Sequence, residues 1–493
     1  MNLIKSATLA AAIFCIVLSQ VSGQTKDETT TIKPETPKEK IKVIDSKLCK
    51  KCDCYIDTNL LECSGKLQDW LSAEDWEILI NGDVVFKTIS LEHNNLTSVP
   101  ILPKYDVENL YLANNQIDSI TVAAFQNLTE LVTLDLSHNR LTSKVMVPDV
   151  FKGPFTINDF ASLENLKILN LGYNDLHSLD ADLFEHIPHI EELVLCSNRF
   201  HVIDQLSETA ISGLQSLKTL DVSYMEIDDL PDTILHGPRD LEILIAAGNL
   251  FNQLPKALKY ATNLTSLVLN ENPIENLIGD NVFPPLTKLT HLSMTFMSKL
   301  YKIGPGAFSE LQSLTELILS DNKLLNEIDE EALSKNVTGG QFLDYPPLEK
   351  VYLNNCNVST LPKQLLVRWD KLKALDLRFN PWNCDNSNDY LINILIDRIN
   401  KTTPVLAKDV KCGGPNKLND VTLLRVANEH MIESSTGSLI WVGLLVVLLI
   451  AVPTIIGAYV MKRRGCFGVF RRHDSGASSA LYNRTSFNED FHI

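Results

Sequence analysis

Apolar residues recur along this chain in an eleven-residue phrase that is typically apolar at positions 1, 4, 6 and 11 and carries Asn at position 9. Leu131–Leu141 is a representative copy. Nine of the eleven gaps between successive copies are 21 to 27 residues long, so one repeating unit organises most of the 493-residue chain. The twelve copies begin at Phe86, Val107, Leu131, Leu166, Ile190, Leu217, Leu241, Leu264, Leu289, Leu314, Leu348 and Leu372.

The alternation within each copy predicts a β-strand. Leu134 and Leu136 are apolar and Asp135 between them is polar, a spacing that gives a strand one buried face. A single repeat cannot cover its own apolar face. We therefore expect the copies to stack on a shared, continuous core.

The Asn at position 9 follows the strand, where the chain must turn. Because a buried amide must be hydrogen-bonded, and Asn offers an acceptor and two donors, we expect each Asn to bond backbone groups of its own and the neighbouring turn. Met225, Met297 and Cys356 replace Asn in three copies, where we expect a local irregularity, a buried water or a tolerated change. The predicted ladder comprises Asn94, Asn115, Asn139, Asn174, Asn198, Asn249, Asn272, Asn322 and Asn380.

With this phrase, residues 49–424 resemble the leucine-rich-repeat family of extracellular proteins. Ala124–Leu128 and Ala307–Leu311 resemble the family's F-x-x-L element. The resemblance implies an α/β solenoid curved like a horseshoe, with a parallel β-sheet on the concave face and short helical turns on the convex side. The twelve repeats occupy residues 86–380.

Two gaps between copies are longer, at 35 and 34 residues. The additional residues lie near Lys144–Asp159 and Lys335–Pro347, and both stretches are rich in Gly, Pro and polar residues. We predict loops there. Insertions of this kind either carry function or accumulate neutrally.

The amino-terminal end is typical of a secreted chain. Residues 1–23 combine Lys5, an apolar run over Ala7–Leu18 and small residues at Val21–Gly23, which predicts a signal peptide. Residues 24–48 are rich in Thr, Pro, Lys and Glu and predict a disordered arm.

Cysteines flank the repeats. Cys49, Cys52, Cys54 and Cys63 lie in a segment, residues 49–85, that resembles the family's amino-terminal cap, and the secreted context favours disulfides over zinc. The resemblance implies the pairs Cys49–Cys54 and Cys52–Cys63. Residues 381–424 resemble the carboxy-terminal cap, although Asn386 replaces one of its cysteines, and the remaining pair is Cys384–Cys412. Without the second bridge we expect residues 413–435 to be less tightly held.

Two further cysteines lie among the repeats. Cys356 takes the Asn position of its copy, and we expect a buried thiol. Cys196 falls one residue past a strand leucine, and we expect it on an exposed edge, where it is either free or joined to another molecule.

The chain also carries a predicted membrane anchor. Residues 439–461 contain no charge and would span about 34 Å as a helix, against a hydrocarbon core of about 30 Å. Lys462–Arg464 follow directly, so we predict a single-pass type I plasma-membrane protein with a juxtamembrane linker at 425–438 and a cytoplasmic tail at 462–493.

The tail suggests two contacts at the membrane. Cys466 lies among five basic residues and two Phe, a pattern that fits palmitoylation and anionic lipid, or a stop-transfer anchor alone. The final Phe491-His-Ile493 fits the groove of a PDZ domain.

Charge and sequons agree with an extracellular surface. The predicted extracellular part excludes Lys5 and the tail, which has six basic and three acidic residues, and it retains 37 basic and 58 acidic residues. This excess of negative charge argues against binding of nucleic acid. The lumenal N-x-[ST] sequons, where we predict glycosylation, are Asn95, Asn127, Asn263, Asn336, Asn357 and Asn400.

No G-x-S-x-G, H-E-x-x-H or P-loop motif occurs, and we predict no enzyme activity, cofactor or metal. The residue between the two strand leucines points away from the core, and several of these residues are apolar or aromatic. Such a strip indicates a partner site, although β-branched residues also simply favour strands. We expect Ile245→Asp and Val268→Asp to abolish binding without unfolding the protein. The predicted partner-binding residues are Tyr111, Val194, Ile245, Val268, Ile318 and Tyr352 on the strands and Tyr173, Tyr224 and Phe296 just past them.

The family resemblance implies a cell-surface recognition protein: an adhesion molecule, receptor or co-receptor that binds an extracellular or membrane protein through its concave face. The alternative is an auxiliary subunit of a channel or another receptor that acts through the membrane helix and basic tail. Exchanging residues 439–472 for an unrelated anchor separates the two, because only the auxiliary subunit loses its function.

Overall fold

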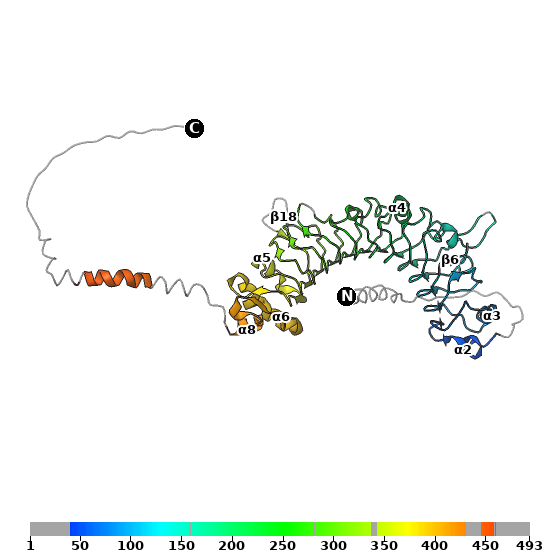
Figure 1. Ribbon diagram of the computed structural model, residues 1–493, viewed down its shortest axis with the longest axis horizontal. Coiled ribbons are helices and arrows are strands. Elements are labelled where there is room, and N and C mark those ends of the chain that lie inside the picture. The colour runs from blue at the N-terminus through cyan, green and yellow to red at the C-terminus, as the bar shows by residue number, and fades with distance from the viewer. Residues whose placement is uncertain are drawn as a thin grey trace, which may run out of the picture. The chain divides into compact units, whose positions relative to one another are not determined.

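The described residues form two compact units. Unit 1 comprises the described residues up to Asn139 together with Val150–Leu166. Unit 2 comprises Arg140–Asp149 together with the described residues from Lys167 onward. The computed structural model (Figure 1) describes residues 40–157, 159–279, 282–336, 343–429, 445–457 and 459.

The sheet of unit 1 follows the order β1-β2-β3-β5-β7. β1 and β2 pair antiparallel, and each later strand is parallel to the one before it. Leu61, Ile89, Leu110 and Leu134 stand side by side at the strand centres, and all are buried. The strands are β1 (Asp53–Tyr55), β2 (Leu60–Glu62), β3 (Thr88–Ser90), β5 (Asn109–Tyr111) and β7 (Thr133–Asp135), with β4 (Ser98–Val99) paired to β6 (Ser119–Ile120) in a second sheet.

The amino-terminal cap holds two disulfides, Cys49–Cys54 and Cys52–Cys63, which are the pairs that the resemblance implies. β1 and β2 of the cap extend the sheet beyond the first repeat strand, β3. The cap therefore covers the end of the stack, where an apolar edge would otherwise meet water. Its helices are the 3-10 turn η2 (Val43–Asp45), α2 (Leu48–Lys51) and α3 (Ala73–Asn81). The prediction of a disordered arm is therefore wrong for residues 40–48, because Val43 and Leu48 are buried and Ile41 N donates to Asn81 O.

Helix α3 begins with a capping box. The Ser72 hydroxyl accepts from the Asp75 backbone N–H, and the Asp75 carboxylate accepts from the Ser72 backbone N–H. Lys51 Nζ lies 3.0 Å from Asp75 Oδ2. Burial alone would raise the pKa of Asp75, but the hydrogen bonds from Ser72 and Lys51 outweigh it and lower the pKa. This network holds α3 to the segment between the cap cysteines.

Unit 2 continues the same pattern, and in Figure 1 its strands follow one another along one side of that unit. Their order is β8-β9-β10-β11-β12-β14-β16-β20-β21, and every adjacent pair is parallel. Each of the twelve sequence copies thus carries one strand, since β3, β5 and β7 belong to the first three. The strands are β8 (Ile168–Asn170), β9 (Glu192–Val194), β10 (Thr219–Asp221), β11 (Ile243–Ile245), β12 (Ser266–Val268), β14 (His291–Ser293), β16 (Glu316–Ile318), β20 (Lys350–Tyr352) and β21 (Ala374–Asp376).

The Asn ladder is confirmed. In unit 1, Asn139 Oδ1 accepts from Ile117 N at 2.9 Å, and its Nδ2 donates to the carbonyls of Leu112 and Leu136 at 3.0 Å. Asn272 of unit 2 bonds Phe251, Ala246 and Leu269 in the same way. Every Asn of the predicted ladder is buried. Each buried amide therefore joins two successive turns through bonds to the backbone.

The three departures from the ladder are absorbed differently. Where Met225 replaces Asn, Asn249 Oδ1 accepts from both Met225 N and Ile227 N, a local irregularity. Where Met297 replaces Asn, Asn322 Oδ1 accepts from Met297 N at 2.7 Å. Cys356 instead mimics Asn, because its Sγ donates to Leu319 O at 3.2 Å. Burial raises the pKa of the Cys356 thiol to about 12, so the thiol keeps the proton that it donates.

Cys196 does not lie on an exposed edge, contrary to the sequence-based expectation. It is 2% exposed. A Cβ added at Gly172, just past the neighbouring strand β8, would stand 2.9 Å from the Cys196 sulfur, so the glycine leaves room for the thiol beside it. A disulfide to another molecule would require this site to open.

The segments that return from one strand to the next are mostly turns. In the two predicted F-x-x-L elements, Leu128 N donates to Phe125 O and Leu311 N donates to Phe308 O, so both are hydrogen-bonded turns rather than regular helices. Regular pieces in unit 2 are α4 (Gln205–Ser212), α5 (Lys363–Leu366), the 3-10 turns η4 (Lys256–Tyr260) and η5 (Trp369–Lys371), and a sheet of β13 (Asn276–Leu277), β15 (Lys302–Ile303) and β17 (Glu327–Ile328).

The two insertions contain paired backbone rather than loops alone. In the first, Phe155 and Phe160 form an antiparallel bridge, and their rings meet edge to face at 5.1 Å. In the second, β18 (Lys335–Asn336) pairs antiparallel with β19 (Leu343–Asp344).

The carboxy-terminal cap is held by the Cys384–Cys412 disulfide and by buried Trp382, whose indole N–H donates to Leu377 O at 2.9 Å. Residues beyond Cys412 are also fixed, since Leu423 N donates to Val410 O and the Leu423 side chain is buried. Backbone hydrogen bonds and buried side chains therefore continue past the disulfide, while the lower stability expected for residues 413–435 stays a prediction. The elements are β22 (Trp382–Asn383) paired with β23 (Cys412–Gly414), the 3-10 turns η6 (Asn386–Asn388) and η8 (Asn416–Leu418), the π-helical turn η7 (Leu391–Leu395), α6 (Ile396–Thr402), α7 (Pro404–Ala407) and α8 (Leu423–Asn428).

The predicted membrane segment, residues 439–461, falls only partly within the described ranges, where residues 445–457 are helical. Of the helices among the residues that the structure describes, none combines the length and apolar character needed to cross a bilayer. The predicted signal peptide, Cys466 and Phe491–Ile493 lie outside the described residues.

Candidate functional site

The third residue of each repeat strand points away from the leucine core, and these residues divide into covered and accessible groups. Tyr111, Ile318 and Tyr352 are partly exposed. Val194, Ile245 and Val268 are buried although they do not face the core. The predicted strip is therefore not uniformly open to a partner. The full set is Ser90, Tyr111, Asp135, Asn170, Val194, Asp221, Ile245, Val268, Ser293, Ile318, Tyr352 and Asp376.

The centre of the strip is an apolar cluster that the chain covers itself. Ile245 is 4% exposed and Val268 is 5% exposed, and both pack with Ala247. Tyr224 and Ile243 lie against these three residues. We call Ile245, Ala247, Val268, Tyr224 and Ile243 the covered cluster. A partner reaches little of Ile245 or Val268 unless Tyr224 moves, and an Asp at either position would be buried.

The Tyr224 side chain covers this cluster by extending over the next repeat to the one beyond it. A Cβ added at Gly248 would stand 2.2 Å from ring carbons of Tyr224, so the ring lies directly on that glycine. Beyond it, the Tyr224 hydroxyl donates to Glu271 Oε1 at 2.7 Å. Burial and this bond to Glu271 raise the pKa of Tyr224 above its ordinary value. The Tyr224 phenol is therefore neutral, with its ring against Gly248 and its hydroxyl bonded to Glu271.

The residue immediately before the ladder, position 8, has a left-handed backbone in all twelve copies, with φ between +52° and +64°. This region favours Gly, Asn and Asp and disfavours bulky side chains. Four copies nevertheless carry an aromatic residue. The twelve residues are His93, Asn114, His138, Tyr173, Ser197, Tyr224, Gly248, Glu271, Phe296, Asp321, Asn355 and Phe379.

Two of these aromatic residues, Phe296 and Phe379, are 57% and 58% exposed, and we call them the edge pair. The two copies between them carry Asp321 and Asn355, whose side chains hydrogen-bond to each other. Next to Phe379, the Arg378 guanidinium lies 5.7 Å from the ring. Phe296 is one of the predicted partner-binding residues and Phe379 is not, although Phe379 occupies the same position 8 in the last copy.

Charged side chains accompany the edge pair on the same strands. Glu316 of β16 lies between His291 of β14 and Lys350 of β20, at 3.3 Å and 3.5 Å respectively. All three occupy the first position of their strands. This row adds hydrogen-bonding groups to the strand face in the repeats that carry Phe296 and its neighbours.

The corresponding face of unit 1 is acidic. The Ser90 hydroxyl donates to Glu92 Oε2 at 3.2 Å. Burial, followed by the charge of Asp135, raises the pKa values of both Glu92 and Tyr111. The predicted site residue Tyr111 thus stands beside carboxylates rather than among apolar side chains.

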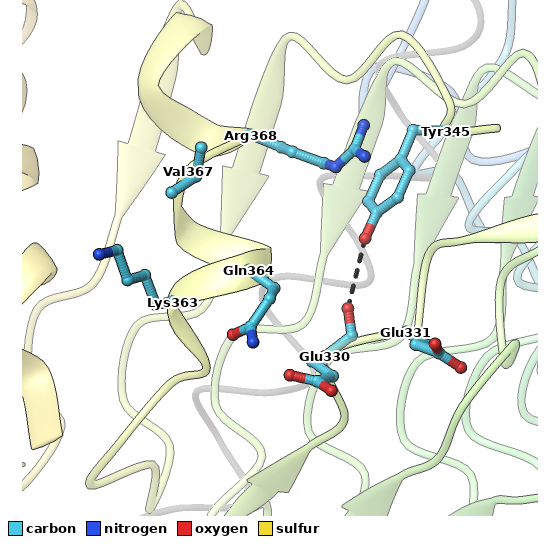
Figure 2. A pocket seen from close by; sticks show the side chains of 7 residues that line it. All are labelled: Glu330, Glu331, Tyr345, Lys363, Gln364, Val367 and Arg368. Carbon is cyan, nitrogen blue, oxygen red and sulfur yellow. Dashed lines mark hydrogen bonds between the residues drawn. The ribbon is translucent and has the colours of Figure 1, made fainter. Parts of the chain in front are cut away.

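A groove of about 650 Å³ lies between the second insertion and α5 in unit 2. Figure 2 shows Tyr345 with its ring against Arg368, whose guanidinium is 3.6 Å from the ring centre, and with its hydroxyl donating to Glu330 O at 3.3 Å. The residues drawn there include no Ser, Cys or His, so the groove lacks the side chains of a nucleophile paired with a His base. It is lined by Glu330, Glu331, Tyr345, Lys363, Gln364, Val367 and Arg368.

The predicted glycosylation sites differ in exposure. Asn95 and Asn357 are exposed, whereas Asn127, Asn263 and Asn400 are partly buried, and the Asn336 side chain lies outside the described residues. Within the described ranges, no group of three or more His, Cys, Asp or Glu side chains is arranged to hold a metal ion.

Two repeat models match the chain. The leucine rich repeat model matches residues 106–154 and 159–200, and the model of a BspA type leucine rich repeat region, six copies long, matches residues 252–360. These matches fall on the copies identified in the sequence and on the strands that form the parallel sheets.

Known relatives share the repeat at moderate identity. Lumican from Mus musculus is 33% identical over 249 residues, which cover 46% of this chain and 62% of lumican. CD180 antigen from Mus musculus is 28% identical over 305 residues, covering 60% of this chain and 39% of that protein. The chain thus spans about three fifths of the length of lumican. Among solved structures, the Drosophila Toll–Spatzle complex aligns with a TM-score of 0.47 and 19% identity, covering 72% of this chain and 56% of that chain. The sequence repeat, the Asn ladder and the two matching models together show that this chain is built of leucine-rich repeats.

Proposed function

We propose that this protein is a cell-surface recognition molecule, an adhesion protein, receptor or co-receptor, that binds a protein partner through the strand face and position-8 edge of unit 2. The repeats lie outside the cell and residues 439–461 anchor the chain, as the signal-peptide pattern and the basic residues after the anchor support. Phe296, Ile318 and Tyr352 contribute direct contacts. Val194, Ile245 and Val268 support the surface from beneath, because they are buried.

The edge pair carries this proposal. A bulky residue at φ near +55° is energetically costly, and such costs persist where a function requires them. For Tyr224, the energetic cost of the left-handed backbone is offset because the ring covers an apolar cluster and the hydroxyl bonds to Glu271. Phe296 and Phe379 keep more than half of their surface in water. Their apolar surface is therefore best explained by contact with another molecule.

The distance between the two rings of the edge pair indicates how far apart the contacting side chains of the partner lie. Phe296 and Phe379 belong to the copies of β14 and β21, which are separated by three strand-to-strand steps. At about 4.8 Å per step the two rings lie roughly 14 Å apart. A partner strand that rises about 3.3 Å per residue brings side chains i and i+4 to nearly this distance. We expect two apolar partner side chains on the rings, with polar groups facing Asp321 and Asn355 between them.

Photo-crosslinking in the full chain, displayed on cells, tests the site. A photoreactive phenylalanine analogue replaces Phe296, Phe379 or Leu250, an exposed apolar residue outside position 8. We expect the same partner to crosslink at 296 and at 379 and not at 250. Equal labelling at all three positions, or none at 296 and 379, contradicts the proposal.

Affinity for the crosslinked partner provides the second measurement. Truncating both rings, in Phe296→Ser with Phe379→Ser, is expected to weaken binding at least 30-fold, because exposed aromatic residues at such a site act as hot spots worth about 2 kcal/mol or more. Exchange of residues 439–472 for an unrelated anchor should leave this binding unchanged. If that exchange abolishes binding and the serine variants do not, the protein acts through its membrane segment instead.

A further inference from the structure

A second concave surface lies in unit 1, away from the strand face. It is a groove of about 590 Å³, within the size range of small-molecule sites. Ile80 and Ile101 on its walls are about half exposed. The Trp70 indole N–H donates to Ser98 O at 2.6 Å, and the Trp76 ring meets Tyr105 edge to face at 6.1 Å, so both indoles are held in place. Its walls include Trp70, Trp76, Ile80, Ile101, Pro103 and Asn127.

Asn127 places a potential attachment point in the wall of this groove. Asn127-Leu128-Thr129 is an N-x-T sequon. Asn127 Nδ2 donates to Leu102 O at 2.8 Å, which uses one of the two N–H groups of the amide. An N-linked glycan replaces one N–H of the amide and leaves the other, so a glycosylated Asn127 retains a donor for Leu102 O.

We propose that the N-linked glycan of Asn127 folds back into this groove and covers Trp70 and Trp76. In the transfer, the amide nitrogen forms a bond to sugar C1 of a lipid-linked oligosaccharide, the lipid pyrophosphate leaves, and the amide proton is released. The sugar then presents C–H groups to the indole faces, whose π-electrons carry the negative end of the ring quadrupole. This inference rests on the proposed cell-surface function in one respect, since the chain must enter the secretory pathway.

Two other Asn residues serve as internal controls, although they directly precede their repeat phrase and Asn127 lies four residues before its own. Asn263 lies in an identical Asn-Leu-Thr sequon, and its Nδ2 donates to Arg239 O at 2.8 Å. Asn165 donates to Thr129 O at 2.8 Å without a sequon. A side-chain amide bonded to the backbone of the preceding repeat therefore occurs with and without a sequon. Asn127 differs in that it also lines a groove with two Trp side chains.

Oxidative footprinting of the full chain, produced in glycosylating cells and held in detergent, tests this arrangement. Thr129→Ala removes the sequon at Asn127, and Thr265→Ala removes the matched sequon at Asn263, while both Asn side chains remain. We expect Thr129→Ala to increase oxidation of Trp70 and Trp76 at least threefold and Thr265→Ala to leave it unchanged. Endoglycosidase trimming of the wild type to one sugar should preserve most of the protection.

The possible results distinguish a failure of the glycan proposal from a failure of the proposed cell-surface function. An unmodified Asn127, or Trp oxidation that is the same with and without its glycan, overturns the inference while leaving the recognition site untouched. If none of the six sequons carries sugar, the proposed cell-surface location fails as well. If protection of the Trp residues in Thr129→Ala depends on protein concentration, a second copy occupies the groove and the glycan assignment is wrong.

Discussion

The covered cluster and the edge pair are both apolar, and both lie in unit 2, yet they differ in what surrounds them. Ile245 and Val268 are shielded by Tyr224, which is itself fixed by Glu271. Phe296 and Phe379 stand in water on a backbone conformation that disfavours them. Apolar composition on a strand face therefore does not identify a binding surface. Exposure combined with an uncompensated energetic cost is the stronger indication.

The largest expected effect is in the covered cluster. Ile245→Asp places a carboxylate where the side chain is 4% exposed, and we expect a loss of about 3 kcal/mol or more in the free energy of unfolding. Denaturant unfolding of the full chain measures this loss. Leu250→Asp, at a residue that is 52% exposed, serves as the control and should change stability by about 0.5 kcal/mol or less. Similar stabilities for the two variants would mean that the cluster is open.

The next effect concerns the contact between Tyr224 and Gly248. Gly248→Ala combines φ of +63° with a Cβ that meets the Tyr224 ring, and we expect a cost of about 2 kcal/mol. In a Tyr224→Ala background the ring is gone, so Gly248→Ala should then cost only the backbone part, about 1 kcal/mol. A double-mutant cycle by thermal unfolding measures the difference. Strict additivity would show that the ring does not rest on the glycine.

A smaller and pH-dependent effect follows from the phenol of Tyr224. Burial and the bond to Glu271 raise its pKa, so the folded state retains the proton above pH 10, where the unfolded state releases it. The stability that this group contributes is fully present below about pH 10 and is lost as pH rises toward the higher folded pKa. Tyr224→Phe should cost about 1 kcal/mol at pH 7. This difference from wild type should shrink above pH 10, and a constant difference would contradict the raised pKa.

The repeat and its ladder were predictable because they depend on local pattern. Leu134, Leu136 and Asn139 lie within six positions and together predict a strand, a core and a bonded turn. The cover over Ile245 was not predictable, because Tyr224 reaches Glu271 across the intervening repeat and the spacing of residues does not reveal which side chain lies on which. The burial of Cys196 beside Gly172 depends in the same way on a neighbouring strand.

The smallest change in stability is expected at the edge pair, with the opposite sign. Phe296→Asn removes an exposed ring and introduces a residue that tolerates φ of +55°, so we expect stability to rise by up to about 1 kcal/mol. Affinity for the crosslinked partner should nevertheless fall at least tenfold. Tyr224→Asn, the same change at a compensated position 8, should lower stability because it uncovers Ile245 and Val268. Thermal unfolding and binding, measured on the same preparations, distinguish the two positions. If Phe296→Asn loses stability as Tyr224→Asn does, the ring packs on its own chain, and the edge pair is a second covered region rather than a surface kept for a partner.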